Sequence, residues 1–110
     1  MSREKALRRP TAFVTGASQG IGAGSAMALA HDGYDVAVAS TELGRLSAIL
    51  AELKAVGANA IPVKLDLRSQ VSIVDAMAQV VSEFGELDVL VNNAGAVVNH
   101  AALELSLIHI

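Results

Sequence analysis

The chain contains no cysteine among its 110 residues, and aromatic side chains make up only 3% of it. The absence of cysteine excludes disulfides, cysteine-ligated zinc and thiol catalysis. The scarcity of aromatic rings excludes a stacking platform for single-stranded nucleic acid. A net charge of −3 argues against a non-specific nucleic-acid binder, which needs a basic surface. No charge-free run of about 18 apolar residues occurs, so the sequence predicts no membrane span.

Both ends of the chain differ from its middle. Four of the eight lysine and arginine residues fall within the first nine positions, and the apolar run of a signal peptide does not follow them before Gly16. We therefore expect residues 1–10 to be a solvated basic leader and the protein to be cytoplasmic. Residues 105–110 can be encoded by CTG-TCT-CTT-ATA-CAC-ATC, the end sequence of a transposon-based sequencing adapter. This predicts a non-native tail, and the alternative is a genuine apolar C-terminus.

Short apolar runs alternate with helical periodicities across the rest of the sequence. Strands are predicted at residues 11–15, 35–40, 60–65 and 87–91. Helices are predicted at residues 21–31, at residues 43–56 and from a Ser69 N-cap to Phe84, and glycines end them: Gly33, Gly57 and Gly85. Because the connections are only about two to six residues long, the pattern predicts right-handed crossovers and one α/β domain with a parallel sheet. Pro62 lacks an N–H donor, which places the third strand at a sheet edge.

The second and third predicted helices each carry an apolar stripe that we expect to be buried. In both stripes the apolar residues are mainly three or four positions apart, which puts them on one side of a helix. The stripe of the second helix consists of Leu43, Leu46, Ile49, Leu50, Leu53 and Val56. The stripe of the third helix consists of Val71, Val74, Met77, Ala78, Val81 and Phe84.

A glycine-rich turn joins the first strand to the first helix and reads Thr15-Gly16-Ala17-Ser18-Gln19-Gly20-Ile21-Gly22. Gly16 lets the chain turn sharply, Gly20 lets the backbone approach a pyrophosphate, and Gly22 lets the helix pack closely on the strand. The helix N-terminus adds unpaired N–H groups and a partial positive charge for the phosphates. The turn therefore predicts a dinucleotide site, and the alternative is a plain glycine-rich turn.

Three motifs, taken in order, resemble one protein family. They are the glycine-rich turn, Asp66-Leu67 after the third strand, and Asn92-Asn93-Ala94-Gly95 after the fourth. Together they resemble the short-chain dehydrogenase/reductase family, and within it the 3-oxoacyl-acyl-carrier-protein reductase branch. The resemblance implies a Rossmann-type doubly wound parallel sheet that is incomplete here, with strands in the order 3-2-1-4 only. Residues 11–104 would then be the N-terminal half of a dinucleotide-binding domain, and the chain would be a truncated N-terminal part.

The resemblance also implies which residues hold the cofactor. The pyrophosphate and ribose would be lined by residues of the turn: Gly16, Ser18, Gln19, Gly20, Ile21 and Gly22. Asp66 would accept a hydrogen bond from the amino group of adenine, with Leu67 beside it; a helix-capping carboxylate is the alternative for Asp66. Asn93, Ala94 and Gly95 would pass under the cofactor ribose, while Asn92 would tie the fourth strand to its neighbours. A polar turn is the alternative for the two asparagines.

The end of the second strand bears on the identity of the cofactor. An acidic residue there would bind the ribose hydroxyls of the adenosine and repel a 2′-phosphate. Ser40 and Thr41 stand there instead, and both hydroxyls can hydrogen-bond to a phosphate. Arg45 is near enough in sequence to reach that phosphate, whereas Glu42 lies one position beyond the site and counts against it. We therefore favour NADP(H), with NAD(H) as the alternative.

No catalytic residue is assigned in this sequence. The family implies hydride transfer between nicotinamide and a carbonyl or alcohol carbon, with a proton-donating Tyr, a Lys four residues later and a Ser that orients the carbonyl. Tyr34 is the single tyrosine, and Val38 stands four positions after it. We therefore expect the chain alone to be inactive. The three histidines are far apart and form no pair at helical spacing, so no metal site is predicted.

Two functions fit these motifs. The first is the cofactor-binding part of an NAD(P)-dependent oxidoreductase that acts on a small carbonyl or alcohol compound; the family implies a homo-tetramer for the full-length protein. The second is a non-catalytic dinucleotide sensor or scaffold on the same fold. A downstream Tyr-x3-Lys segment would distinguish the enzyme from the sensor. Neither function involves a nucleic-acid or membrane partner.

Overall fold

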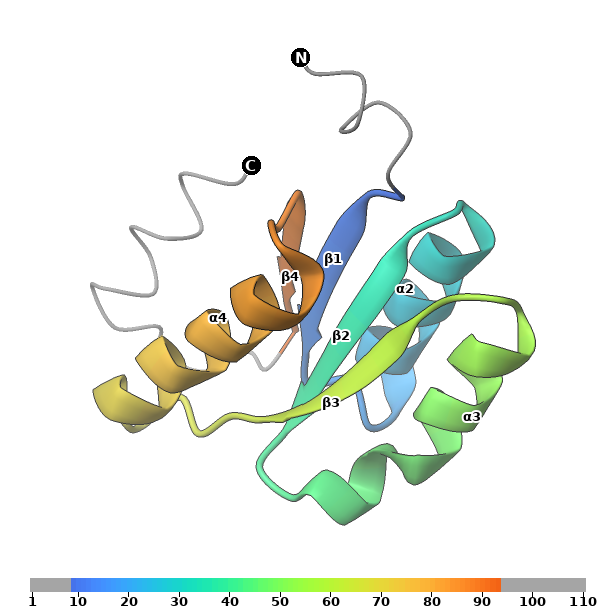
Figure 1. Cartoon of the computed structure of the whole chain (residues 1–110). Helices are drawn as coiled ribbons and strands as arrows, with labels where there is room; N and C mark the ends of the chain where they lie inside the picture. Colours follow the sequence, from blue (N-terminus) through green and yellow to red (C-terminus); the bar gives the residue numbers. More distant parts are fainter. Residues whose placement is uncertain (1–8, 94–110) are drawn as a thin grey trace.

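A computed structural model describes residues 9–93, which form a four-stranded parallel sheet with helices on both faces (Figure 1). The strands are β1 (Thr11–Thr15), β2 (Asp35–Ser40), β3 (Ala60–Lys64) and β4 (Val89–Asn92). The helices are α2 (Gly20–His31), the 3-10 helix η1 (Leu43–Leu46), α3 (Ser47–Ala55) and α4 (Gln70–Phe84). The sheet order β3-β2-β1-β4 confirms the predicted order 3-2-1-4. Most of the predicted leader and all of the predicted tail lie outside the described residues.

Alternate residues of the two central strands face opposite layers of helices. Phe13 and Ala37 pack with the α4 side of the sheet, whereas Val14 and Val38 pack with the side covered by α2 and α3. Successive side chains of a strand point to opposite faces, so a strand covered on both faces must be apolar throughout. This is why β1 and β2 appear in the sequence as continuous apolar runs.

The third strand lies at an edge of the sheet, as Pro62 predicts. Pro62 is in register with Val38 of β2, and β2 is the only strand of the described sheet that pairs with β3. The carbonyl oxygen of Pro62 accepts a hydrogen bond from Gln79 Nε2 at 3.2 Å. This contact shows that Gln79 lies on the side of α4 next to β3.

The prediction of the buried stripe of α4 was largely wrong. The residues that pack onto the sheet are Ile73, Ala76, Met77 and Val80, with Phe84 partly buried. Val71, Val74 and Val81 are instead 69%, 49% and 42% exposed. The helix carries two adjacent apolar stripes, and both follow spacings of three and four, so periodicity cannot choose between them. The choice depends on how the helix lies on the sheet, which is decided by the packing of these buried residues.

The predicted helix at residues 43–56 is divided in two. Its first turn is the 3-10 helix η1, in which Arg45 N–H donates to the carbonyl oxygen of Glu42, three residues back, at 3.1 Å. The tighter turn leaves Leu43 47% exposed, and Val56 at the far end of the stripe is 38% exposed. The middle of the stripe is confirmed, because the following residues are buried: Leu46, Ile49 and Leu53.

Candidate cofactor site

The carboxyl ends of parallel strands lie at the same edge of the sheet, where α/β proteins bind ligands. Two backbone hydrogen bonds converge on the end of β2 at this edge. Ala17 N–H donates to the carbonyl oxygen of Ala39 at 3.2 Å, and Leu65 N–H donates to that of Ser40 at 3.0 Å. The first bond attaches the glycine-rich turn, and the second attaches the segment that follows β3. The structure therefore brings the turn, the end of β2 and the Asp66 segment together along one edge.

The hydroxyl of Thr15 joins the ends of β1 and β4. It donates to Asn92 Oδ1 at 2.8 Å and accepts from the backbone N–H of Asn93 at 3.1 Å. Thr15 is only 3% exposed, so both bonds are shielded from water on the Thr15 side. These bonds place Asn93 next to the start of the glycine-rich turn.

The turn is built so that a helix begins against the end of a strand. Gly16 and Gly20 both have positive φ, at 61° and 63°, a conformation that side chains disfavour. A Cβ on Gly22 would lie 2.7 Å from the carbonyl carbon of Gly16 and would overlap its oxygen. A Cβ on Gly20 would meet no other atom within 4 Å, so the space beside Gly20 is open.

The first turn of α2 offers its backbone N–H groups to an anion. The side chain of the N-cap Gln19 makes no capping hydrogen bond, and no acidic residue occupies the first turn. The first N–H groups of a helix have no partner within the helix, and the helix dipole favours negative charge there. Ser18 is half-buried and Ile21 is 81% exposed, so Ile21 presents an apolar side chain beside these groups.

A buried donor without a partner lies at the same edge. Asn93 Nδ2 is buried and makes no hydrogen bond. An unsatisfied buried donor typically costs about 1–3 kcal/mol, so natural proteins usually provide an acceptor for it. A ligand rich in oxygen, such as a ribose or a phosphate, would supply that acceptor. The open space at Gly20 and this donor both fit a dinucleotide.

At the end of β2, the side chains form a small exposed network. Ser40 is half-buried, and its hydroxyl accepts a hydrogen bond from the backbone N–H of Glu42 at 3.3 Å. Arg45 Nε lies 3.3 Å from Glu42 Oε2, and the two side chains are 63% and 66% exposed. Thr41 is exposed. The guanidinium group predicted to reach a 2′-phosphate is thus present at this edge and is paired with the carboxylate that counts against it.

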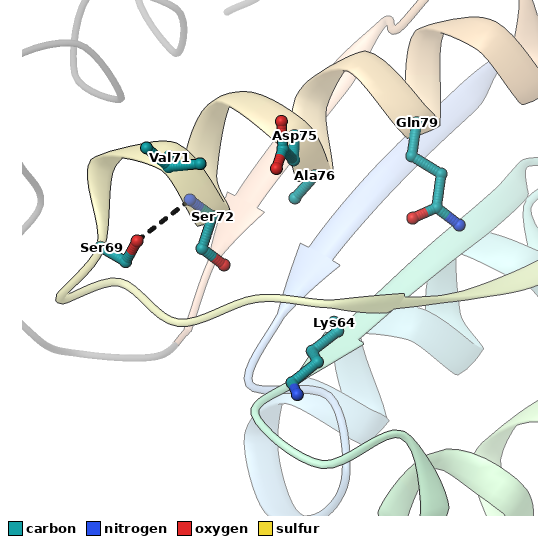
Figure 2. Close-up of a pocket in the computed structure, with 7 residues that line it drawn as sticks. All are labelled: Lys64, Ser69, Val71, Ser72, Asp75, Ala76 and Gln79. Atoms are coloured by element: carbon teal, nitrogen blue, oxygen red, sulfur yellow. Dashed lines mark hydrogen bonds between the residues drawn. The ribbon is translucent and has the colours of Figure 1, made fainter.

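Asp66 does not cap α4. The cap is the predicted Ser69, whose hydroxyl accepts from Ser72 N–H at 3.2 Å (Figure 2). Ser72 Oγ in turn accepts from the backbone N–H of Asp66 at 2.9 Å. The carboxylate of Asp66 is bound instead by Arg68, while Leu67 packs partly against the core.

Asp66 is an ionised group at neutral pH. The side-chain hydrogen bonds of Arg68 and the backbone N–H of the same residue hold the pKa of Asp66 below its usual value, and the pKa of Arg68 is raised in return. An ionised carboxylate only accepts hydrogen bonds. Asp66 can therefore act only as an acceptor towards a ligand at this edge.

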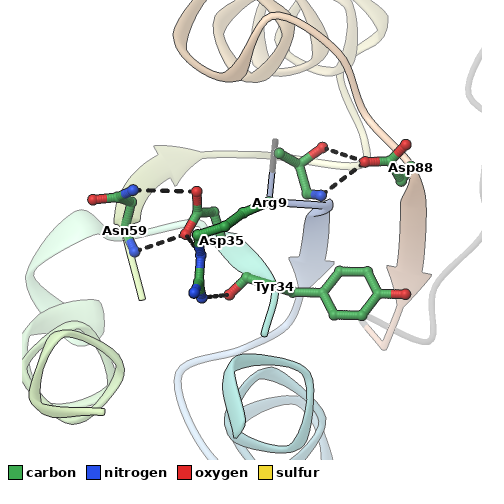
Figure 3. A network of polar contacts seen from close by, with 6 residues as sticks. Arg9, Tyr34, Asp35, Asn59 and Asp88 are labelled. Atoms are coloured by element: carbon green, nitrogen blue, oxygen red, sulfur yellow. Dashed lines mark hydrogen bonds and ion pairs between the residues drawn. The ribbon is translucent and has the colours of Figure 1, made fainter. Parts of the chain in front are cut away.

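A polar cluster that the sequence analysis missed lies at the opposite end of the sheet (Figure 3). Asp35 Oδ1 accepts from Arg9 Nε at 2.7 Å and from Asn59 N–H at 3.0 Å. Burial acts to raise the pKa of Asp35, but the hydrogen bonds from Asn59 and Arg9 outweigh it and hold the pKa below its usual value. Tyr34, whose carbonyl oxygen accepts from Arg9 Nη2 at 3.2 Å, belongs to this cluster and precedes β2. The only sequence signal was an acidic residue at the start of an apolar strand.

Other features of the described residues do not add to the site. Ala94 and Gly95 lie outside the described residues. Within residues 9–93, no group of three or more His, Cys, Asp or Glu side chains could hold a metal ion. No helix in this part of the chain is long and apolar enough to cross a membrane. A pocket of about 410 Å³ opens between β3 and α4, and its lining includes none of the residues predicted to bind a cofactor (Figure 2).

Comparison with known proteins agrees with this geometry. The family model described as short chain dehydrogenase matches residues 10–109. An L-rhamnose 1-dehydrogenase (NAD(P)(+)) of a Sphingomonas species is 40% identical over 102 residues, which are 92% of this chain and 40% of that protein. The chain thus spans less than half the length of this relative.

Two solved structures are similar in fold and sequence. One is a 3-oxoacyl-[acyl-carrier protein] reductase from Brucella melitensis in complex with NAD, with a TM-score of 0.75 and 40% identity over 80% of this chain and 34% of that one. The other is a metagenomic short-chain oxidoreductase in complex with NADP, with a TM-score of 0.76 and 37% identity over 83% of this chain and 41% of that one.

Proposed function

Because this chain belongs to the short-chain dehydrogenase family, we propose that the carboxyl edge of its sheet binds a nicotinamide dinucleotide, with NADP(H) preferred over NAD(H). The observation that carries the proposal is the glycine-rich turn. Gly22 lies directly against the backbone of Gly16, while the space above Gly20 is open at the start of α2. This arrangement leaves backbone N–H groups of the helix accessible to a pyrophosphate.

Each segment of the edge has a role in this proposal. Residues 18–22 bind the pyrophosphate and the adjoining ribose through their backbone N–H groups, together with Gly16. Asn93 uses its unpaired amide nitrogen for a ribose oxygen. Ala94 and Gly95, outside the described residues, would bind the same ribose, as the family resemblance implies. Asp66 accepts from the adenine amino group, with Leu67 beside it. When bound, the cofactor supplies hydride exchange with a carbonyl or alcohol carbon, and the residues of this chain bind and orient it.

The preference for NADP(H) rests on the end of β2. Ser40 and Thr41 provide hydroxyl groups where a carboxylate would repel a 2′-phosphate, and Arg45 provides a positive charge one helical turn later. The side chains of Arg45 and Glu42 are both exposed, so a phosphate can replace Glu42 as the partner of Arg45 at little cost in free energy.

We further propose that the whole protein reduces or oxidises a small carbonyl or alcohol compound. Tyr34 does not serve as the proton donor, because it precedes β2 and its carbonyl oxygen is bonded to Arg9 at the amino end of the sheet. The groups that transfer the proton would therefore come from residues other than 9–93. The chain by itself would bind cofactor without turning over a substrate.

Fluorescence titration of the chain with NADPH and with NADH tests the cofactor proposal. We expect saturable binding of both, with NADPH bound roughly five- to tenfold more tightly because of its charge-assisted contacts. Arg45→Gln should reduce this preference, whereas Lys54→Gln, which removes an exposed cation from α3, should not. Tighter binding of NADH would overturn the preference, and the absence of saturable binding of either nucleotide would overturn the site itself.

A further inference from the structure

The side chain of Arg68 binds the carboxylate of Asp66 through two parallel hydrogen bonds. Arg68 Nε donates to Oδ1 at 3.0 Å and Nη2 donates to Oδ2 at 3.2 Å. The backbone N–H of Arg68 donates a third bond, to Oδ1 at 2.9 Å. A forked pair of this kind holds the plane of a carboxylate as well as its charge.

The backbone of Asp66 is held just as firmly as its side chain. Its N–H donates to Ser72 Oγ at 2.9 Å, and its carbonyl oxygen accepts from Ser69 N–H at 3.0 Å. Ser69 is the N-cap of α4 and Ser72 lies in its first turn, so the segment that contains Asp66 is anchored to a helix end. The orientation of the carboxylate therefore depends on Arg68, while its location depends on α4.

Counting acceptors shows what the carboxylate still offers. Each carboxylate oxygen can accept about two hydrogen bonds. Oδ1 already accepts two from Arg68, whereas Oδ2 accepts one. The side chain of Asp66 is 34% exposed, so Oδ2 keeps one acceptor position that a ligand at the carboxyl edge can reach.

We propose that Arg68 is a positioning residue that orients Asp66 Oδ2 to read the exocyclic amino group of the adenine base. The inference rests on the proposed cofactor site and goes beyond it, because Arg68 need not touch the cofactor. Adenine donates from its amino group, whereas hypoxanthine has a carbonyl oxygen at the same position and would face the carboxylate as a second acceptor. The pair thus makes the edge selective for the base as well as for the phosphates.

The experiment compares the Kd of NADPH with that of its hypoxanthine analogue, both measured by nucleotide fluorescence on the whole chain. We expect the unmodified chain to prefer NADPH by about tenfold, as one hydrogen bond to a charged acceptor implies. Arg68→Ala should reduce the preference to about twofold, mainly by weakening NADPH binding. Asp66→Asn should also reduce the preference for NADPH to about twofold. The double variant should show the same preference as Asp66→Asn alone, because Arg68 acts only through Asp66.

Arg68→Lys separates geometry from charge. Lysine keeps the positive charge but lacks the planar fork, so we expect it not to restore the preference for adenine. Thermal melting of each variant checks that the fold is retained, and because Arg68 is 88% exposed, its variants should melt as the unmodified chain does.

Three results would overturn the inference. They are equal binding of the two nucleotides by the unmodified chain, an unchanged preference in Arg68→Ala, and full recovery in Arg68→Lys. Each of these leaves NADPH binding intact and so spares the proposed dinucleotide site, although equal binding by the unmodified chain would also remove the role proposed for Asp66. Failure of the unmodified chain to bind NADPH would overturn both the inference about Arg68 and the proposed function.

Discussion

Gly22 of helix α2 lies so close to Gly16 that a Cβ on Gly22 would stand 2.7 Å from the carbonyl carbon of Gly16. This approach allows the first turn of α2 to pack directly against the residue that follows β1. The glycine-rich turn is therefore a packing requirement of the fold in addition to a candidate phosphate site.

Gly22→Ala should consequently disturb both stability and cofactor binding. The added methyl group must displace the backbone of Gly16, and we expect a loss of about 1–3 kcal/mol in the free energy of unfolding, with weaker NADPH binding. Gly24→Ala is the matched control in the same helix, because a Cβ there meets nothing within 4 Å. It should raise stability by about 0.5–1 kcal/mol, as alanine does in a helix interior. Equal effects of the two variants in chemical denaturation would contradict the close approach.

Thr15→Val tests the link between β1 and β4. The change keeps the shape of the side chain but removes the hydroxyl that bonds to Asn92 Oδ1 and Asn93 N–H. We expect a loss of about 1–3 kcal/mol in stability and weaker NADPH binding, because Asn93 belongs to the proposed site.

Thr11→Val provides the control at the other end of β1. The hydroxyl of Thr11 donates to the carbonyl oxygen of Glu86 at 2.6 Å, and Thr11 is 2% exposed. Its loss should lower stability by a similar amount and leave the Kd of NADPH unchanged. If both threonine variants bound NADPH equally well, the hydroxyl of Thr15 would not position Asn93 for cofactor binding.

The two apolar stripes of α4 should differ sharply in their energetic weight. Val80 is fully buried against the sheet, and Val80→Ala should cost about 2 kcal/mol of stability. Val74 is 49% exposed, and Val74→Ala should change stability by less than about 0.5 kcal/mol. Urea denaturation of the two variants measures the difference. A larger loss of stability for Val74→Ala would show that the stripe predicted from periodicity is the buried one.

Asp35 should make stability depend on pH in the acid range. Its pKa is lower in the folded chain than in the unfolded chain, where the pKa of aspartate is about 3.9. The stabilisation is therefore fully present above that value and is lost as the pH falls through the folded pKa. At pH 7, Asp35→Asn should cost about 1–2 kcal/mol, a modest figure because Arg9 is 43% exposed.

Acid unfolding monitored by circular dichroism measures this dependence. Between pH 5 and pH 2, Asp35→Asn should lose less stability than the unmodified chain, because the variant has no carboxylate to protonate at this position. Glu52→Gln, a change at an exposed position of α3, should leave the profile of the unmodified chain in place. An identical acid profile in Asp35→Asn would show that the cluster around Asp35 does not contribute.

Much of the fold and of the candidate site could be predicted from residue order. Strands covered on both faces must be apolar throughout, so β1 and β2 were predicted with the bounds that the structure has. Glycines at positions 33, 57 and 85 have positive φ where they end helices, and this conformation is rare for other residues. The glycine-rich turn could be located for the same reason, since its chemistry is local to eight consecutive residues.

Other features depend on contacts between distant residues, and only the tertiary structure decided them. The sequence offered two equivalent apolar stripes on α4, and the packing of the helix on the sheet selected the one that contains Val80. Arg9 and Asn59 are 26 and 24 positions away from Asp35, so no local pattern could reveal their cluster. The sequence by itself therefore determined the order of strands and helices and the place of the glycine-rich turn, because these follow from local backbone preferences and burial. Which side chains meet across the sheet was decided by tertiary packing, because it depends on the relative positions of whole elements.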